Sequence, residues 1–232
     1  MSADPPVVVD VDTAQGPGRL LLSEAESPRA LLVLGHGAGG GVDGVDLLTL
    51  SRLLPPRGVT VARYVQPWKV SGRRVAVRPA LLDEAWTPAV RALREVLAGV
   101  PLVVGGHSAG ARVACRTADA AGAAGVLALS FPLHPPGRPS SSRLPELLAP
   151  GVPVLVVQGE RDPFGSASEV RLALEDAGRG RPAAIEVVEV PAAGHDLLPR
   201  RASGVDAAAW WEARSTAISD WIGGIAAGLP SL

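Results

Sequence analysis

Cysteine is almost absent from this chain, and that absence excludes several kinds of site. Cys115 is the only cysteine among 232 residues, so no internal disulfide can form. It lies two turns into a predicted helix, and we expect it to be a small buried core residue. No cluster of Cys and His has the spacing of a zinc site. The sequence therefore predicts no bound metal and no cofactor.

Aromatic side chains and excess charge are also scarce. Aromatic residues make up 3% of the chain, so its core must consist of Val, Leu and Ala. The formal net charge of −1 indicates neither nucleic acid nor an anionic membrane as a partner. No apolar run is long enough to span a bilayer, and the acidic, proline-broken N-terminal residues are unlike a signal peptide. We expect a cytoplasmic protein, and the sequence indicates no particular oligomeric state.

The sequence does contain many apolar residues, at 47% of the chain, and they predict one α/β domain over residues 1–232. An opening hairpin is expected from Val7–Val11 and Arg19–Leu22 around Gly16-Pro17-Gly18. Further strands are predicted near 30–35, 59–64, 101–105, 125–130, 153–158 and 184–190, and helices near 43–54, 80–98, 109–121, 167–177 and 205–227. This alternation predicts a mostly parallel central sheet with helices on both faces. The irregular stretch 131–150 is too short for a large cap domain.

The most informative motif is Gly106-His107-Ser108-Ala109-Gly110, a G-x-S-x-G between a predicted strand and a predicted helix. In that setting the serine lies at the apex of a strained turn with its hydroxyl exposed above the sheet. Small neighbours are needed because strand and helix cross almost in contact. Ser108 is therefore the predicted nucleophile, and the amide of Ala109 is a predicted oxyanion donor at the helix N-terminus.

A nucleophilic serine needs a histidine as base and a carboxylate that orients the histidine. Glu160 and Asp162 both follow the predicted strand at 153–158, and we predict Asp162 because Pro163 fixes its turn. His195 follows the edge strand at 184–190, in a loop that contains Gly194. The chain order is then serine, acid, histidine, as the motif requires.

A second glycine-rich loop, His36-Gly37-Ala38-Gly39-Gly40-Gly41, directly follows the predicted strand at 30–35. Such a loop supplies the second oxyanion donor in this kind of site. We predict the amide of Ala38, with Gly37 and Gly39 as close alternatives. A phosphate loop is not indicated, because neither G-x-x-x-x-G-K-[ST] nor G-x-G-x-x-G with an acidic partner is present.

Two loops are predicted to shape a substrate pocket. In the first, Trp68 would form a wall while Lys69, Arg73 and Arg74 attract a carboxylate or phosphate; the alternative is a solvated basic loop. In the second, Phe131, Leu133 and His134 would line the acyl side. His36 is a further pocket candidate. On the last helix we expect Trp210, Ile218 and Ile222 to pack in the core.

The ordered motifs H-G-A-G-G, G-H-S-A-G, R-D-P-F-G and A-G-H-D make the chain resemble the α/β-hydrolase superfamily over nearly its full length. It looks like the small predicted-hydrolase, or dienelactone-hydrolase-like, branch, which the stretches 66–74, 82–86 and 131–137 also resemble. True dienelactone hydrolases use a cysteine nucleophile, whereas this chain has Ser108. The resemblance implies Ser108, Asp162 and His195 as a catalytic triad.

The sequence therefore predicts a serine hydrolase that cleaves an ester- or thioester-type acyl bond of a small molecule through an acyl-enzyme. Two alternatives stay open. One is a binding or scaffold protein that keeps the α/β-hydrolase fold without catalysis, as some relatives of the branch do. The other is an acyltransferase that uses the same triad.

Overall fold

Eight strands form one sheet in the computed structural model, which describes residues 5–97, 99–178 and 183–228. The sheet order is β1-β2-β4-β3-β5-β6-β7-β8. Strand β1 is antiparallel to β2, and β2 is antiparallel to β4. The remaining pairs are parallel, so the six strands β3 to β8 all run in one direction. The strands are β1 (Val7–Thr13), β2 (Gly16–Ser23), β3 (Ala30–Gly35), β4 (Val59–Val65), β5 (Leu102–His107), β6 (Gly125–Leu129), β7 (Val154–Gly159) and β8 (Ile185–Val190).

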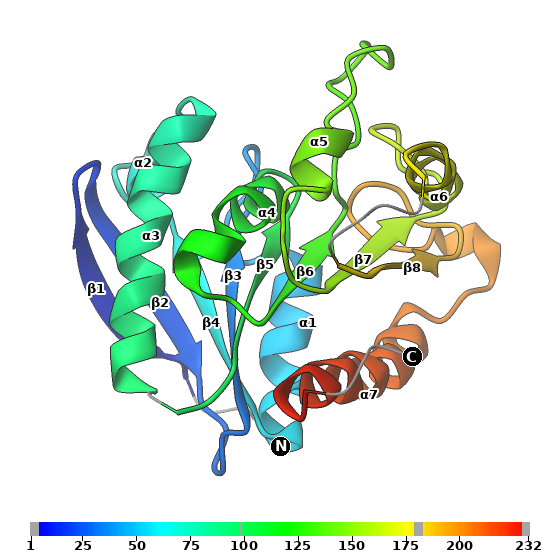
Figure 1. Cartoon of the computed structure of the whole chain (residues 1–232). Coiled ribbons are helices and arrows are strands. Elements are labelled where there is room, and N and C mark those ends of the chain that lie inside the picture. The colour runs from blue at the N-terminus through cyan, green and yellow to red at the C-terminus, as the bar shows by residue number, and fades with distance from the viewer. Residues whose placement is uncertain (1–4, 98, 179–182, 229–232) are drawn as a thin grey trace.

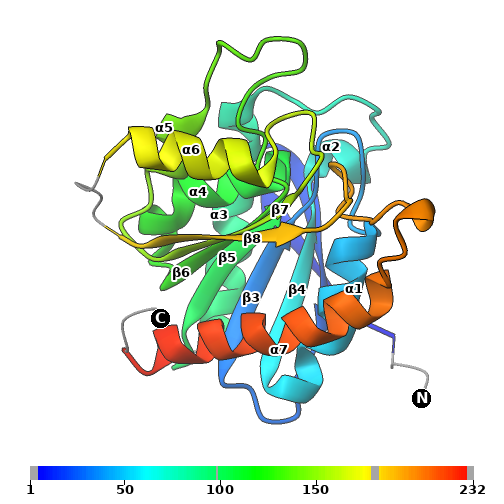
Figure 2. The same cartoon turned by 90° about the vertical axis from the view of Figure 1, so that its right-hand side faces the viewer.

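Helices cover both faces of the sheet (Figure 1 and Figure 2). Helices α1 (Val45–Leu53) and α7 (Ala207–Ala226) lie side by side on one face. The other face carries α3 (Pro79–Val96), α4 (Ala109–Ala121) and α6 (Ala167–Asp176). The short elements are α2 (Pro67–Val70), α5 (Leu144–Leu147) and the 3₁₀ turns Pro55–Arg57 and Arg201–Ser203. Within the described residues, not one helix combines the length and apolarity needed to cross a membrane.

The predicted mostly parallel sheet with helices on both faces is confirmed. The strands from β3 onward and the five long helices begin and end within two residues of their predicted bounds. Strand β8 is a half-buried edge strand, and the 131–150 stretch holds only the four-residue helix α5, so no cap covers the sheet there. Cys115 is buried in the core as expected.

One local prediction is wrong, and another holds only in part. The hairpin turns at Ala14 and Gln15, and Gly16-Pro17-Gly18 belong to β2. Gly18 is a packing residue instead, because a Cβ there would overlap the ring of Tyr64. On α7, Trp211 is buried with Ile218 and Ile222, while Trp210 is only partly buried at the edge of that cluster. Relative to Ile218, Trp211 lies seven residues away and only about 20° round the helix, whereas Trp210 lies eight residues away and about 80° round it, at the edge of the apolar face.

The backbones of β3, β5 and α4 approach one another closely at the carboxyl ends of the parallel strands. Gly35 at the end of β3 lies against Gly106 in β5 and Gly110 in α4, and a Cβ on either of the latter two would overlap the carbonyl oxygen of Gly35. Gly106 has a φ of 154°. These glycines let β3, β5 and α4 converge, so the loops after β3 and β5 lie next to each other.

Candidate active site

Ser108 lies at the turn between β5 and α4, in a backbone conformation that L-residues avoid. Its φ of 53° and ψ of −105° fall outside the ordinary regions. The turn is held by surrounding structure, since the Ser108 amide donates to the carbonyl of Leu129 at 2.9 Å. Ser108 is also the N-cap of α4. The hydroxyl is thus presented beside the unpaired amides of the first helical turn, including that of Ala109.

The structure brings His195 and Asp162 together with Ser108. The Ser108 hydroxyl oxygen lies 2.9 Å from Nε2 of His195, and Nδ1 of His195 lies 2.8 Å from Oδ2 of Asp162. Glu160, the alternative acid, accepts from the amide of Ala192 at 2.6 Å and so ties the loop after β7 to the loop after β8. Asp162 is buried, and the ring of His195 is partly exposed.

Asp162 contacts three hydrogen-bond donors, and sequence reasoning missed the two besides His195. Its Oδ1 accepts from the amide of Phe164 at 2.9 Å, and its Oδ2 accepts from Nε2 of Gln158 at 3.0 Å. The ring of Phe164 packs edge-on against His195 with centroids 4.4 Å apart. The sequence does contain a sign of the role of Gln158, because it is the one polar side chain in the otherwise apolar strand β7. These contacts hold the carboxylate and the imidazole in one orientation.

The glycine-rich loop after β3 lies against the serine. A Cβ on Gly37 would be 3.6 Å from Cβ of Ser108, and Ala38 lines the same cavity as Ser108. Gly39 faces open space. His36 anchors the loop from below, because its Nδ1 contacts the Gly37 carbonyl at 2.9 Å and its Nε2 accepts from the amide of Gln66 at 3.2 Å. Burial lowers the pKa of His36, which keeps this ring neutral.

A second histidine–carboxylate pair stands next to the first and was not predicted. Nδ1 of His107 lies 2.8 Å from Oδ2 of Asp46, a carboxylate buried at the start of α1. The His107 ring lines the same cavity as Ser108 and packs edge-on against His195, with ring centroids 5.1 Å apart. Nothing in the spacing of Asp46 and His107 along the chain signals this contact. The pair joins the first turn of α1, into which the glycine-rich loop leads, to the last residue of β5, which precedes Ser108.

The cavity in front of Ser108 has a volume of about 610 Å³. Its wall consists mainly of the glycine-rich loop, the first turn of α1, and the loop after β8. Charged side chains at this wall are Lys69, Asp43, Asp46 and Asp196. Lys69 is the only residue of the predicted basic loop among the residues that line it.

The other predicted pocket residues lie elsewhere, and those predictions are corrected. Phe131 and Leu133 are buried in the hydrophobic cluster that also contains residues of α3, α4 and α6, so they do not line the cavity in front of Ser108. His134 contacts the Pro135 carbonyl at 3.2 Å and does not line the cavity.

His36 and Trp68 pack against each other beneath the glycine-rich loop, with centroids 5.3 Å apart. Arg73 and Arg74 follow α2 and are exposed; neither lines the cavity in front of Ser108, and Arg73 lines a separate cavity with Trp68. Pro67 starts α2, and this extra turn redirects the basic loop.

Two further groups take no part in this geometry. Burial raises the pKa of the Cys115 thiol to about 12, so it is an inert core residue. Within the residues that the structure describes, no group of three or more His, Cys, Asp or Glu side chains is arranged to hold a metal ion.

Comparison with known proteins assigns the family. The family described as "Alpha/beta hydrolase domain" matches residues 28–223, which is most of the chain. The chain belongs to the α/β-hydrolase family. This confirms the resemblance that the motifs carry, and the hydrolase fold is that of the parallel sheet described above. No curated protein matches the chain.

Solved structures of hydrolases share the fold at low sequence identity. A serine hydrolase of Xanthomonas campestris, described as lacking a lid, is 17% identical, with a TM-score of 0.67 and coverage of 100% of this chain and 99% of that one. The dienelactone hydrolase of Anabaena variabilis is 17% identical, with a TM-score of 0.71 and coverage of 96% and 98%. Est1E of Butyrivibrio proteoclasticus is 13% identical, with a TM-score of 0.69 and coverage of 95% and 99%.

Proposed function

We propose that this chain is a serine hydrolase that cleaves an ester or thioester bond of a small acyl substrate. The observation that supports this proposal most directly is the hydrogen-bonded series Asp162–His195–Ser108 at the wall of an open cavity. Neighbouring folds include proteins named as a serine hydrolase and a dienelactone hydrolase, which is consistent with acyl chemistry.

In the proposed reaction, Ser108 Oγ attacks the carbonyl carbon while Nε2 of His195 takes the hydroxyl proton. Asp162 holds the Nδ1–H tautomer of His195 and stabilises the imidazolium. The Ala109 and Ala38 amides receive the negative charge on the carbonyl oxygen. His195 then protonates the leaving group, and a water activated by the same histidine hydrolyses the acyl-enzyme.

In this mechanism the Asp46–His107 pair holds the loop that carries Ala38 in place beside Ser108. The loop that carries Ala38 also contains Gly37 and Gly39–Gly41, and glycine backbone is conformationally permissive. A 2.8 Å contact between Asp46 and His107 fixes the end of that loop to the residue preceding Ser108. Asp46 is thus a positioning residue that maintains the spacing between the two oxyanion donors.

A fluorophosphonate probe tests the proposal directly, because it labels an activated serine whatever the natural substrate is. We expect labelling of the wild-type chain, none of Ser108→Ala, and normal labelling of Ser168→Ala, whose serine is exposed on α6. Absence of Ser108-dependent labelling in folded protein would refute hydrolysis and favour a scaffold. Product analysis with added alcohols or amines distinguishes hydrolysis from acyl transfer.

A further inference from the structure

A second cavity adjoins the one in front of Ser108 and has a different chemical character. It has a volume of about 570 Å³ and extends over the outward face of α1. Val45 and Leu198 line both cavities, so the two spaces meet at these residues. From there the second cavity, called the trough below, leads away from the reacting serine.

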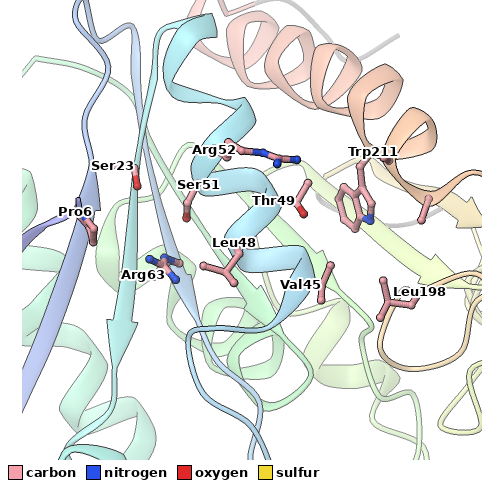
Figure 3. Close-up of a pocket in the computed structure, with 12 residues that line it drawn as sticks. Pro6, Ser23, Val45, Leu48, Thr49, Ser51, Arg52, Arg63, Leu198 and Trp211 are labelled. Carbon is pink, nitrogen blue, oxygen red and sulfur yellow. The ribbon is translucent and has the colours of Figure 1, made fainter. Parts of the chain in front are cut away.

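The outward face of α1 forms the floor of the trough (Figure 3). Val45, Leu48, Thr49 and Arg52 follow a spacing of three, four and seven residues, which places them on one side of the helix. Val45 and Leu48 are 46% and 42% exposed, and they lie next to each other on this side of the helix. This face therefore offers an apolar track that the described residues leave open.

Leu198 and Trp211 form one bank of the trough, and Figure 3 shows Arg63 on the opposite side of α1. Trp211 is buried, and its indole N–H has no acceptor in the described part of the chain. Nε of Arg63 is likewise buried and unpartnered there. Both unsatisfied groups are hydrogen-bond donors, which favours a ligand that supplies acceptors.

Charge separates the trough from the catalytic cavity. The described residues lining the trough include Arg52 and Arg63 and no carboxylate. Arg63 is partly neutralised by Asp43 at 3.3 Å, whereas Arg52 has no ion-pair partner within the described residues. The catalytic cavity instead combines Lys69 with three aspartates.

Asp206 forms no ion pair with Arg52 among the described residues. Asp206 precedes the lining residue Ala207, but its carboxylate caps α7 by accepting from the amides of Ala208 and Ala209 at 2.9 and 3.1 Å. Arg52 thus stays the uncompensated cation at the end of an apolar track.

We propose that the trough binds the far end of the acyl substrate, an apolar arm that carries a terminal carboxylate. This inference rests on the proposed function, since it takes the reacting carbonyl to be at Ser108. The arm passes between Val45 and Leu198, lies on Leu48 and meets Arg52. Seven residues of helix separate Val45 from Arg52, a rise of roughly 10 Å, so the arm must extend well beyond the reacting carbonyl.

Hydrolysis of two matched esters tests the inference. The mono-p-nitrophenyl ester of suberic acid ends in a carboxylate, and p-nitrophenyl octanoate has the same chain length without it. We expect a higher kcat/KM for the anionic ester in wild-type protein. In Arg52→Gln the ratio of anionic to neutral kcat/KM should fall about tenfold, the size of one charge-assisted contact. Arg91→Gln removes an exposed arginine on α3 and should leave the ratio unchanged.

Direct binding separates the trough from catalysis. Ser108→Ala protein is titrated calorimetrically with octanoate and with octanamide, an uncharged molecule of the same length. We expect octanoate to bind more tightly, and Arg52→Gln or Leu48→Glu to weaken it about tenfold. The inference would be overturned if the octanoate affinity were the same in Arg52→Gln and Leu48→Glu as without these changes. It would also be overturned if a substitution of Lys69, and not of Arg52, weakened octanoate binding. Octanoate binding lost in Arg52→Gln, with no ester hydrolysed by wild-type protein, would support the trough and contradict the proposed function.

Discussion

Asp162 and Glu160 show that the role of a carboxylate depends on the direction of its side chain. Both carboxylates follow β7, within two positions of each other. Asp162 accepts from His195, while Glu160 accepts from the backbone amide of Ala192. One is therefore placed to orient the base and the other to join two loops.

Amide variants should separate these roles. Asp162→Asn should reduce kcat on the order of 10⁴, because the amide favours the wrong histidine tautomer. Glu160→Gln should reduce it much less, since the new side chain still offers a carbonyl oxygen to Ala192. Turnover of the p-nitrophenyl ester that the wild-type chain hydrolyses fastest measures both. Equal losses in the two variants would contradict this separation of roles.

The arrangement of strands and helices determines where the reacting groups lie. The loop after β3 and the turn after β5 belong to neighbouring parallel strands, and the Asp46–His107 contact joins them. This explains how a glycine-rich loop can present an amide in a defined place.

Removing that contact should affect rate more than binding. Asp46→Ala is expected to lower kcat about tenfold or more with little change in KM, because a charge-assisted hydrogen bond is lost. Asp46→Asn, which keeps a hydrogen bond, should recover part of the loss. His107→Ala combined with Asp46→Ala should cost about as much as either change alone. Additive losses would contradict the positioning role.

A second inter-element contact makes stability depend on pH. The carboxylate of Glu146 on α5 forms ion pairs with the guanidinium groups of Arg112 and Arg116 on α4, each with an N–O distance of 2.6 Å. Burial by itself would raise the pKa of Glu146, but the hydrogen bonds and charges of Arg112 and Arg116 outweigh it and hold that pKa below its ordinary value. The contact therefore stabilises the fold above the unfolded-state pKa of about 4.3 and is lost as pH falls through the lower folded-state value.

Glu146→Gln should then have a lower melting temperature than wild-type protein at neutral pH, with the gap closing as the solution is acidified below about pH 4. Thermal unfolding followed by circular dichroism across that range measures it. A gap that persists unchanged in acid would mean that Glu146 contributes through packing alone.

At the scale of the whole molecule, the two hydrophobic clusters share one sheet. Neighbouring residues of a strand point to opposite faces, so Val103 packs with α1 and α7 while Val104 packs with α3 and α4. Neither cluster can be exposed without disrupting the strands that support the other.

We therefore expect the chain to unfold as a single domain. Urea transitions followed by tryptophan fluorescence and by far-ultraviolet circular dichroism should coincide. Trp86 reports on one cluster and Trp211 on the other, so Trp86→Phe and Trp211→Phe variants show which cluster each signal follows. Separate transitions for the two reporters would argue for two units.

The sequence by itself determined the order of strands and helices, the turn at Ser108 and the presence of an acid and a histidine after the last strands. Each of these depends on a local pattern: apolar periodicity, glycines at a close crossing, or the chain order of a motif. Only the tertiary structure decided what surrounds the serine. The Asp46–His107 contact, the burial of Phe131 and the direction of the Arg73–Arg74 loop depend on how distant segments pack. Such packing balances many small terms, and no short pattern along the chain records it.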